Sequence, residues 1–289
     1  MELPVVVGVD GSEASLRAAE WAADEAVLHA LPLRVVYASL WERYEGAGIA
    51  DDVGKPPEEA LAEDVVDAAA RRARQRQPDL KVTTDVLPEE AEYALVREGR
   101  NAALVVVGAR GRGGLTTFLL GSVSLSVAGH ADCPVVVLRG SHDNQARTAV
   151  RGRVVVGVGE GHEAAAVVRF AAEEARLRGV PLEAVRAWRC PAHETTDLPL
   201  PAGEPARVHE QRAADVVEAA LAAVPPEVRV HCRTAEGHAR RVLEAASGNA
   251  DLLVVGSRRR HGEGGLQLGR VAHAVLHQSA CAVAVVRHA

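Results

Sequence analysis

The feature that most constrains the fold of this chain is an internal repeat, because four segments of the first half return in the same order in the second half. PVVVGVDGSEAS, which begins at Pro4, returns as RVVVGVGEGHEA from Arg153, 149 residues later. ALVVVGAR from Ala103 returns as DLLVVGSR from Asp251, 148 residues later. Two shorter matches keep these offsets: WAADEA with FAAEEA, and DCPVVVLR with ACAVAVVR. Such self-similarity predicts two tandem copies of one domain, at residues 1–140 and 152–289, joined by a polar linker at 141–151.

Within each copy, short runs of β-branched residues alternate with longer amphipathic segments. In the first copy the predicted strands are Leu3–Val9, Leu33–Ala38, Lys81–Leu87, Ala103–Val107 and Val135–Leu138. The predicted helices are Glu13–Ala30, Pro57–Gln77, Pro88–Arg100 and Ser122–His130. Several strands are continuous runs of valine, which is typical of strands buried on both faces. The alternation predicts an α/β fold in which each copy is a five-stranded, doubly wound parallel sheet flanked by helices.

Composition and charge exclude several classes of protein. The 289 residues are 48% hydrophobic and 25% charged, which is typical of a globular chain. Because the formal net charge is −6 and no basic domain stands out, we expect no nucleic-acid partner. No apolar run reaches the roughly 18 residues of a membrane helix, and the N-terminus lacks the pattern of a secretory signal. We therefore expect no membrane association and a cytoplasmic location, with the four cysteines reduced.

Two glycine-containing turns follow strands that the topology should bring together. The segment Gly8–Ser12 (GVDGS) ends the first strand, and the segment Gly108–Gly111 (GARG) ends the fourth. In a doubly wound sheet, ligands bind beyond the carboxyl ends of the central strands, where the strand order reverses. We therefore expect both turns to line one binding site.

The residue types in and after these turns suit a nucleotide. Glycines allow backbone N–H groups to approach a ligand closely. Ser122 is predicted to cap the next helix, whose N-terminus is an anion site, and Ser124 could add a hydroxyl. Asp10 supplies a carboxylate suited to the hydroxyls of a sugar. Phosphate at one end and sugar at the other indicate a nucleotide, whereas the simpler alternative is that the glycines only mark loops.

The pattern Gly108-x2-Gly111-x9-Gly121-Ser122, with VVVGVDGS in the first strand and CPVVVLR in the last, resembles the universal stress protein family. The resemblance covers nearly the whole chain as two tandem domains. It implies a Rossmann-like (adenine nucleotide alpha hydrolase-like) fold in which each sheet has strand order 3-2-1-4-5. It also implies that an adenine nucleotide, ATP with Mg²⁺, binds where the strand order reverses.

When the family's motif is carried over by position, the nucleotide-binding residues all belong to the first copy. The resemblance implies that Val9 and Asp10 flank the ribose and adenine, and that the main chain of Ala38 contacts the base. Arg110 could neutralise a triphosphate or could be a solvated loop charge. The remaining predicted binding residues are Gly8, Val107, Gly108, Gly111, Gly121, Ser122, Val123 and Ser124.

The second copy departs from this pattern where the nucleotide would bind. Gly159 replaces Asp10, so the acid expected beside the ribose is missing. Later matched positions hold Gly256 for Gly108, Arg259 for Gly111, Gly269 for Gly121 and Arg270 for Ser122. A side chain at the position of Gly111 would fill the space where backbone should approach phosphate. We therefore expect ATP in the N-terminal domain only.

The motifs contain no recognisable nucleophile–base pair or metal cluster. His273 and His277 lie four residues apart, but no third ligand follows at a recognisable spacing. We expect a regulatory nucleotide-binding module of the stress response rather than an enzyme, with any ATP hydrolysis slow. Two alternatives stay open: a ligand-free interaction scaffold, and an adenylyl-transferring or pyrophosphatase-type enzyme of similar fold. The sequence identifies no particular protein partner and leaves a homodimer open.

Overall fold

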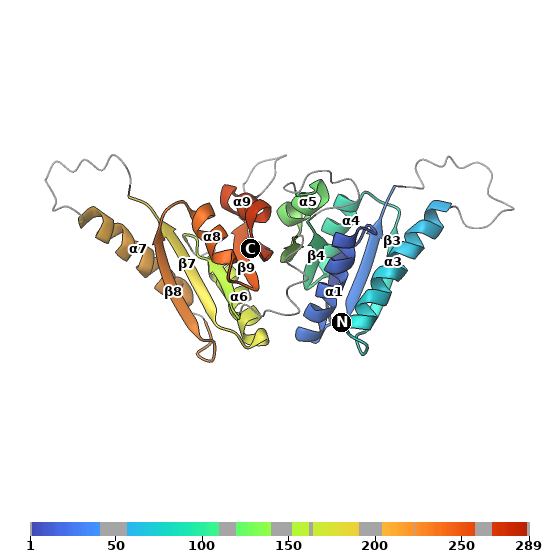
Figure 1. Cartoon of the computed structure of the whole chain (residues 1–289), viewed down its shortest axis with the longest axis horizontal. Helices are drawn as coiled ribbons and strands as arrows, with labels where there is room; N and C mark the ends of the chain where they lie inside the picture. The colour runs from blue at the N-terminus through green and yellow to red at the C-terminus, as the bar shows by residue number, and fades with distance from the viewer. Residues whose placement is uncertain are drawn as a thin grey trace. The chain divides into compact units, whose positions relative to one another are not determined.

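A computed structural model of the chain describes residues 2–40, 57–109, 120–139, 152–161, 164–190, 204–222, 224–257 and 268–287 (Figure 1). The chain forms two compact units, of which the N-terminal unit consists mainly of Met1–Asn144 and the C-terminal unit mainly of the rest. Arg110, Gly111 and Arg259 lie outside the described residues, as does the predicted linker at 141–151. No helix in the described ranges is both long enough and apolar enough to cross a membrane.

The N-terminal unit is built around five parallel strands in the order β3-β2-β1-β4-β5. The strands are β1 (Val5–Gly8), β2 (Leu33–Ala38), β3 (Val82–Leu87), β4 (Leu104–Gly108) and β5 (Val135–Leu138). The helices are α1 (Glu13–Leu28), α3 (Pro57–Arg76), α4 (Ala91–Glu98) and α5 (Ser122–His130). Helix α1 packs beside α3, and α4 packs beside α5 (Figure 1), so every residue of the inner strands β1 and β4 is buried. The expected α/β fold class is confirmed, and this sheet has the order 3-2-1-4-5.

The C-terminal unit repeats the arrangement, with parallel strands in the order β8-β7-β6-β9-β10. The strands are β6 (Val154–Gly157), β7 (Leu182–Trp188), β8 (Val230–Glu236), β9 (Leu252–Ser257) and β10 (Ala282–Arg287). The helices are α6 (Ala164–Arg178), α7 (Glu204–Leu221), α8 (Ala239–Ser247) and α9 (Arg270–Gln278). Helix α6 packs beside α7 and α8 beside α9, so the pairing of helices in the first unit recurs in the second.

One predicted helix is shorter than expected at both ends. The sequence predicts a helix at Pro88–Arg100, whereas α4 spans Ala91–Glu98 and a 3₁₀ turn follows at Gly99–Asn101. Leu87 precedes a proline, which disfavours helical backbone, and it ends strand β3. Gly99 lowers helix propensity at the other end, where the chain tightens into the 3₁₀ turn.

A glycine at the end of the first strand of each unit allows a helix to pack closely on the sheet. An ideal Cβ on Gly8 would lie 2.6 Å from Cδ1 of Leu95 on α4. The matched glycine of the C-terminal unit, Gly157, has the same relation to Leu243 on α8, at 2.9 Å. Both distances are shorter than a Cβ tolerates, so the leucine occupies the volume that a side chain on the glycine would need.

Candidate functional site

The turns that follow β1 and β4 lie at the same edge of the N-terminal sheet, as predicted, because the two strands are parallel neighbours with Gly8 paired to Val107. Helix α1, which follows β1, begins close to the end of β4. An ideal Cβ on Gly108 would lie 3.1 Å from the carbonyl carbon and oxygen of Ala14. The missing side chain of Gly108 therefore allows the first turn of α1 to approach the end of β4.

The carboxylate of Asp10 is held in place at the end of β1. Its Oδ1 accepts hydrogen bonds from the backbone N–H of Ser12 at 3.0 Å and from the Ser12 hydroxyl at 2.6 Å. Between them Gly11 has φ of +79°, in the left-handed region that glycine adopts at little cost. Ser12 also caps α1, because its side-chain oxygen accepts from the N–H of Ser15. The turn thus fixes a partly exposed acid beside the end of β4.

The chain returns to this edge at the start of α5. The N–H of Gly121 donates to the carbonyl of Ala109 at 2.8 Å, and the N–H of Ala109 donates to Leu138 at 2.6 Å. Residues 109 and 121 are therefore joined directly at the end of β4. The N-terminus of α5 is placed by main-chain hydrogen bonds, next to the turn that holds Asp10.

The prediction that Ser122 caps α5 is wrong by one residue. The N-cap is Gly121, with extended backbone (φ −66°, ψ 151°), and Ser122 is the first helical residue. Glycine has no side-chain acceptor, and the structure shows no side-chain cap at this end. Helix N-termini of this kind present N–H groups and the positive end of the helix dipole to an anion. The correction thus strengthens the case for an anion site at this helix.

Ser124 binds the protein main chain instead of pointing its proton at a ligand. Its side chain is buried, and its hydroxyl donates to the carbonyl oxygen of Gly108 at 2.6 Å. A serine hydroxyl has one proton, which this hydrogen bond uses. Ser124 therefore attaches the first turn of α5 to the end of β4, and we assign it a positioning role.

The other predicted residues are distributed over the same edge. Val9 and Val107 are buried, and they follow or lie near the end of the neighbouring strands β1 and β4. Ala38 ends β2, which pairs with β1, and Gly8 packs against Leu95 as described above. Ser122 is exposed and Val123 is half-buried on α5.

The matched edge of the C-terminal unit contains an arginine that the sequence interpretation missed. Arg186 on β7 donates through Nη1 to the carbonyl of Val158 at 3.0 Å, and its Nη2 lies 2.5 Å from Oε1 of Glu160. Val158 matches Val9 at an offset of 149, so the guanidinium lies at the end of β6, at the position that Val9 has in the first copy. Arg186 matches Tyr37 at an offset of 149, and this change from aromatic to cationic was visible in the sequence.

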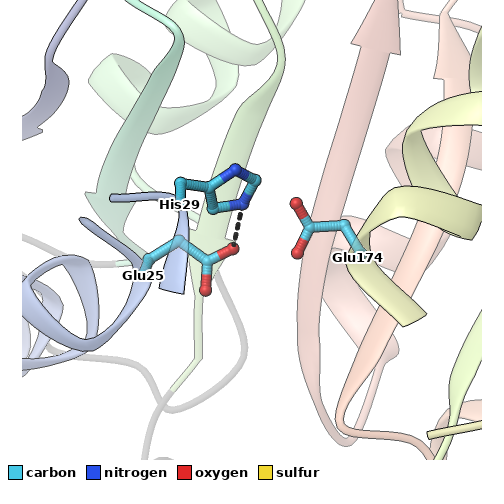
Figure 2. Close-up of side chains that lie close together, drawn as sticks. All are labelled: Glu25, His29 and Glu174. Carbon is cyan, nitrogen blue, oxygen red and sulfur yellow. Dashed lines mark ion pairs between the residues drawn. The ribbon is translucent and has the colours of Figure 1, made fainter. Parts of the chain in front are cut away.

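Another polar pair lies at the C-terminal end of α1, at the end of the helix opposite to Ser12. Nε2 of His29 lies 3.3 Å from Oε1 of Glu25, one helical turn earlier (Figure 2). The matched positions on α6 hold Glu174 and Arg178, which form an ion pair and are likewise four residues apart in the sequence. Both acids are buried, and in each unit the acid is followed four residues later by a basic side chain, histidine in one unit and arginine in the other.

Comparison with known proteins agrees with this architecture. The model of the universal stress protein family matches residues 2–139 and 151–287. A universal stress protein of Mycobacterium tuberculosis (strain H37Rv) is 36% identical over 291 residues, which cover 99% of this chain and 96% of that protein. A universal stress protein of Mycobacterium bovis is 32% identical over 302 residues, which cover 98% and 96% of the two chains.

Solved structures include proteins of the same kind. The crystal structure of a universal stress protein from Archaeoglobus fulgidus covers 100% of both chains with a TM-score of 0.67 at 18% identity, a likeness of fold. Another universal stress protein of Archaeoglobus fulgidus, solved in complex with dAMP, is 26% identical, covers 47% of this chain and 97% of its own, and has a TM-score of 0.36.

Proposed function

Since this chain belongs to the universal stress protein family, we propose that its N-terminal unit binds an adenine nucleotide, ATP in complex with Mg²⁺. The observation that supports this most directly is the uncapped N-terminus of α5, which main-chain hydrogen bonds hold at the end of β4. The acid Asp10 lies at the end of the neighbouring strand. An anion site and a carboxylate at one edge fit the two ends of a nucleotide.

In this proposal the phosphates lie at the first turn of α5, next to Gly121 and Ser122. Val9 and Asp10 flank the ribose and adenine, and the main chain of Ala38 contacts the base. Asp10 already accepts two hydrogen bonds from Ser12. Mg²⁺ would therefore take most of its oxygens from phosphates and water, as it usually does in nucleotide sites.

The C-terminal unit takes no ATP in this proposal. Arg186 uses the carbonyl of Val158 and the carboxylate of Glu160, so the place of the base contains a guanidinium. Gly159 offers no carboxylate to a ribose, and Arg270 begins helix α9. The chain would therefore hold one nucleotide.

We propose that this nucleotide has a regulatory role and that the protein acts in the cytoplasm. ATP would shift the N-terminal unit between two states of different affinity for the nucleotide, and a protein partner would distinguish those states. Hydrogen exchange with and without Mg-ATP tests this role, because identical protection of α5 and of the β1–α1 turn would contradict it.

The binding proposal is tested by native mass spectrometry of the full chain with Mg-ATP. We expect one nucleotide per chain. The variant Gly121→Arg should lose it, because a cationic side chain would lie where the phosphates approach. The matched control Gly269→Arg changes the N-cap of α9, which has nearly the same backbone angles as that of α5, and should retain one nucleotide.

Other outcomes of these measurements would favour one of the alternative functions. Two nucleotides per chain would show that Arg186 and Arg270 leave the second unit open to ATP. No nucleotide at millimolar ATP would favour a ligand-free scaffold. Release of pyrophosphate from ATP would favour the enzyme alternative.

A further inference from the structure

The carboxyl edge of the C-terminal unit contains a pocket of about 440 Å³, a size in the range of small-molecule sites. The apolar residues that line it come from the turn after β6 and from α6, β7 and α8, and include Val158, Val167, Val185 and Leu243. Each of these side chains is buried. The pocket therefore has a wall that can pack against an apolar body.

The charged residues that line the pocket carry a net positive charge. They are Arg186, Arg270 and Glu160, and the carboxylate of Glu160 already pairs with Arg186. Nε of Arg186 is buried and has no hydrogen-bond partner among the described residues. Arg270 likewise has no ion-pair partner among the described residues. An anion in the pocket would therefore meet a positive charge that the described protein groups do not neutralise.

Two glycines that line the pocket have open space beside them. A Cβ added to Gly159, in the turn after β6, or to Gly269, at the start of α9, would meet nothing within 4 Å. Gly159 occupies the position of Asp10, and Arg270 that of Ser122. Compared with the first copy, this edge has lost an acid and gained a cation, so its preference should move from sugar hydroxyls toward anionic groups.

We propose that this pocket is a second ligand site, for a small organic anion with an apolar body and no adenine nucleotide moiety. The anionic group lies beside Arg270 at the start of α9, and the apolar body packs against Val158 and Leu243. The site goes beyond the ATP site of the N-terminal unit, which shares none of these residues.

The probe for this site is 1-naphthyl phosphate, with neutral 1-naphthol as its uncharged counterpart. The full chain is titrated calorimetrically in the presence of saturating Mg-ATP, so that a nucleotide site in the N-terminal unit is already filled. We expect one probe per chain and at least about tenfold weaker binding of 1-naphthol, because the charge should contribute roughly 1.4 kcal/mol or more. Absence of heat at millimolar probe, or equal binding of the two compounds, would overturn the proposal.

Three variants locate the probe. Gly159→Phe fills the open end of the pocket and should abolish binding, and Arg270→Glu should weaken it at least about tenfold by reversing one charge. Arg229→Glu makes the same charge change at the amino end of β8, where Arg229 is exposed, and should leave binding unchanged. Thermal unfolding of each variant confirms that it is folded. Binding that survives both Gly159→Phe and Arg270→Glu would place the probe elsewhere and overturn the proposal.

The ATP site of the N-terminal unit and the anion site of the C-terminal unit can be disproved independently of each other. If native mass spectrometry shows no bound ATP, the proposed nucleotide site is contradicted. The expected effects of the pocket variants on probe binding are not affected by that result. Displacement of the probe by ATP, together with two nucleotides per chain, would contradict the second site and leave the first intact.

Discussion

Nε of Arg34 lies 2.7 Å from Oδ2 of Asp85 across strands β2 and β3, and the matched positions of the C-terminal unit carry the same pair with the charges exchanged. There Glu183 accepts from Arg233 at 3.4 Å. Each central residue has a second partner: Glu98 lies 2.7 Å from Arg34, and Arg153 lies 2.9 Å from Glu183. One sheet thus surrounds a cation with acids, and the other surrounds an acid with cations.

The first prediction concerns how much the ion pairs of Arg34 contribute to the free energy of unfolding. The carboxylate of Glu98 is 9% exposed, whereas that of Asp85 is 39% exposed. Arg34→Met should therefore destabilise the protein by about 1–2 kcal/mol, because the buried Glu98 loses one partner and, among the described residues, retains its ion pair with Arg97. Asp85→Asn, the matched control, should cost less than about 1 kcal/mol. Urea unfolding measures both, and equal losses would contradict the assignment.

A second prediction compares a glycine whose added Cβ would meet neighbouring backbone with a glycine that has open space beside it. Gly108→Ala should destabilise the protein by about 1–3 kcal/mol, because the new Cβ meets the backbone of Ala14 and the helix must shift. It should also weaken ATP binding. Gly159→Ala is the control, since its Cβ meets nothing within 4 Å and its φ is not in the left-handed region. Thermal unfolding should show no loss for Gly159→Ala, and a loss as large as that of Gly108→Ala would contradict the difference in packing.

The third prediction follows from the hydroxyl of Ser124. Ser124→Ala should cost about 1 kcal/mol, because the hydrogen bond to the carbonyl of Gly108 is buried. ATP affinity should fall as well, since the start of α5 loses its attachment to β4. Ser122→Ala removes an exposed hydroxyl two residues earlier and should change stability by less than about 0.5 kcal/mol. Equal unfolding midpoints for the two variants would rule out the positioning role of Ser124.

Cysteine reactivity gives a fourth prediction. Burial raises the pKa of the Cys133 thiol to about 12, so at pH 8 almost none of it is the reactive thiolate. Cys232 is exposed and should react much faster with iodoacetamide in the native protein. Mass spectrometry of the peptides measures both rates, with urea-unfolded protein as the control in which the difference disappears. Equal rates in the native protein would be inconsistent with a buried Cys133.

A fifth prediction concerns acid stability at the start of α1. Nη1 and Nη2 of Arg72 donate to the two carboxylate oxygens of Glu13, at 2.9 and 3.0 Å, and this hydrogen bonding lowers the pKa of Glu13 from its ordinary 4.5. A lowered pKa in the folded state means that the contribution is present above pH 4.5 and is lost as the pH falls through the folded pKa. Glu13→Gln should therefore reduce stability at pH 7, and the difference from the natural chain should vanish in stronger acid. A difference that does not depend on pH would contradict this.

The fold could be predicted because the pattern that specifies it is local and repeated. Valine runs such as Val5–Val7 and Val135–Val137 indicate strands buried on both faces, and the repeat gave two independent examples of the same alternation. The place of the candidate site followed from topology, since parallel neighbours end at one edge. The two turns after β1 and β4 therefore had to meet.

Details that depend on one residue's backbone or on side chains reaching across strands could not be predicted in this way. Gly121 and Ser122 are both acceptable at an N-cap, so the sequence did not decide which of them caps α5. The reach of Arg186 to Val158 depends on the geometry of two strands. The packing of Leu95 in the space beside Gly8 could not be predicted either, and the ligand contact expected of Gly8 stays a prediction.

That contact between Gly8 and Leu95, repeated between Gly157 and Leu243, limits how the sequence can change. A methyl group added to the glycine would lie 2.6 or 2.9 Å from a leucine methyl group, so the leucine side chain would have to move. A larger residue at the glycine is therefore accommodated most easily together with a smaller residue at the leucine. In each unit these two positions act as a pair, and a change at one is felt first at the other.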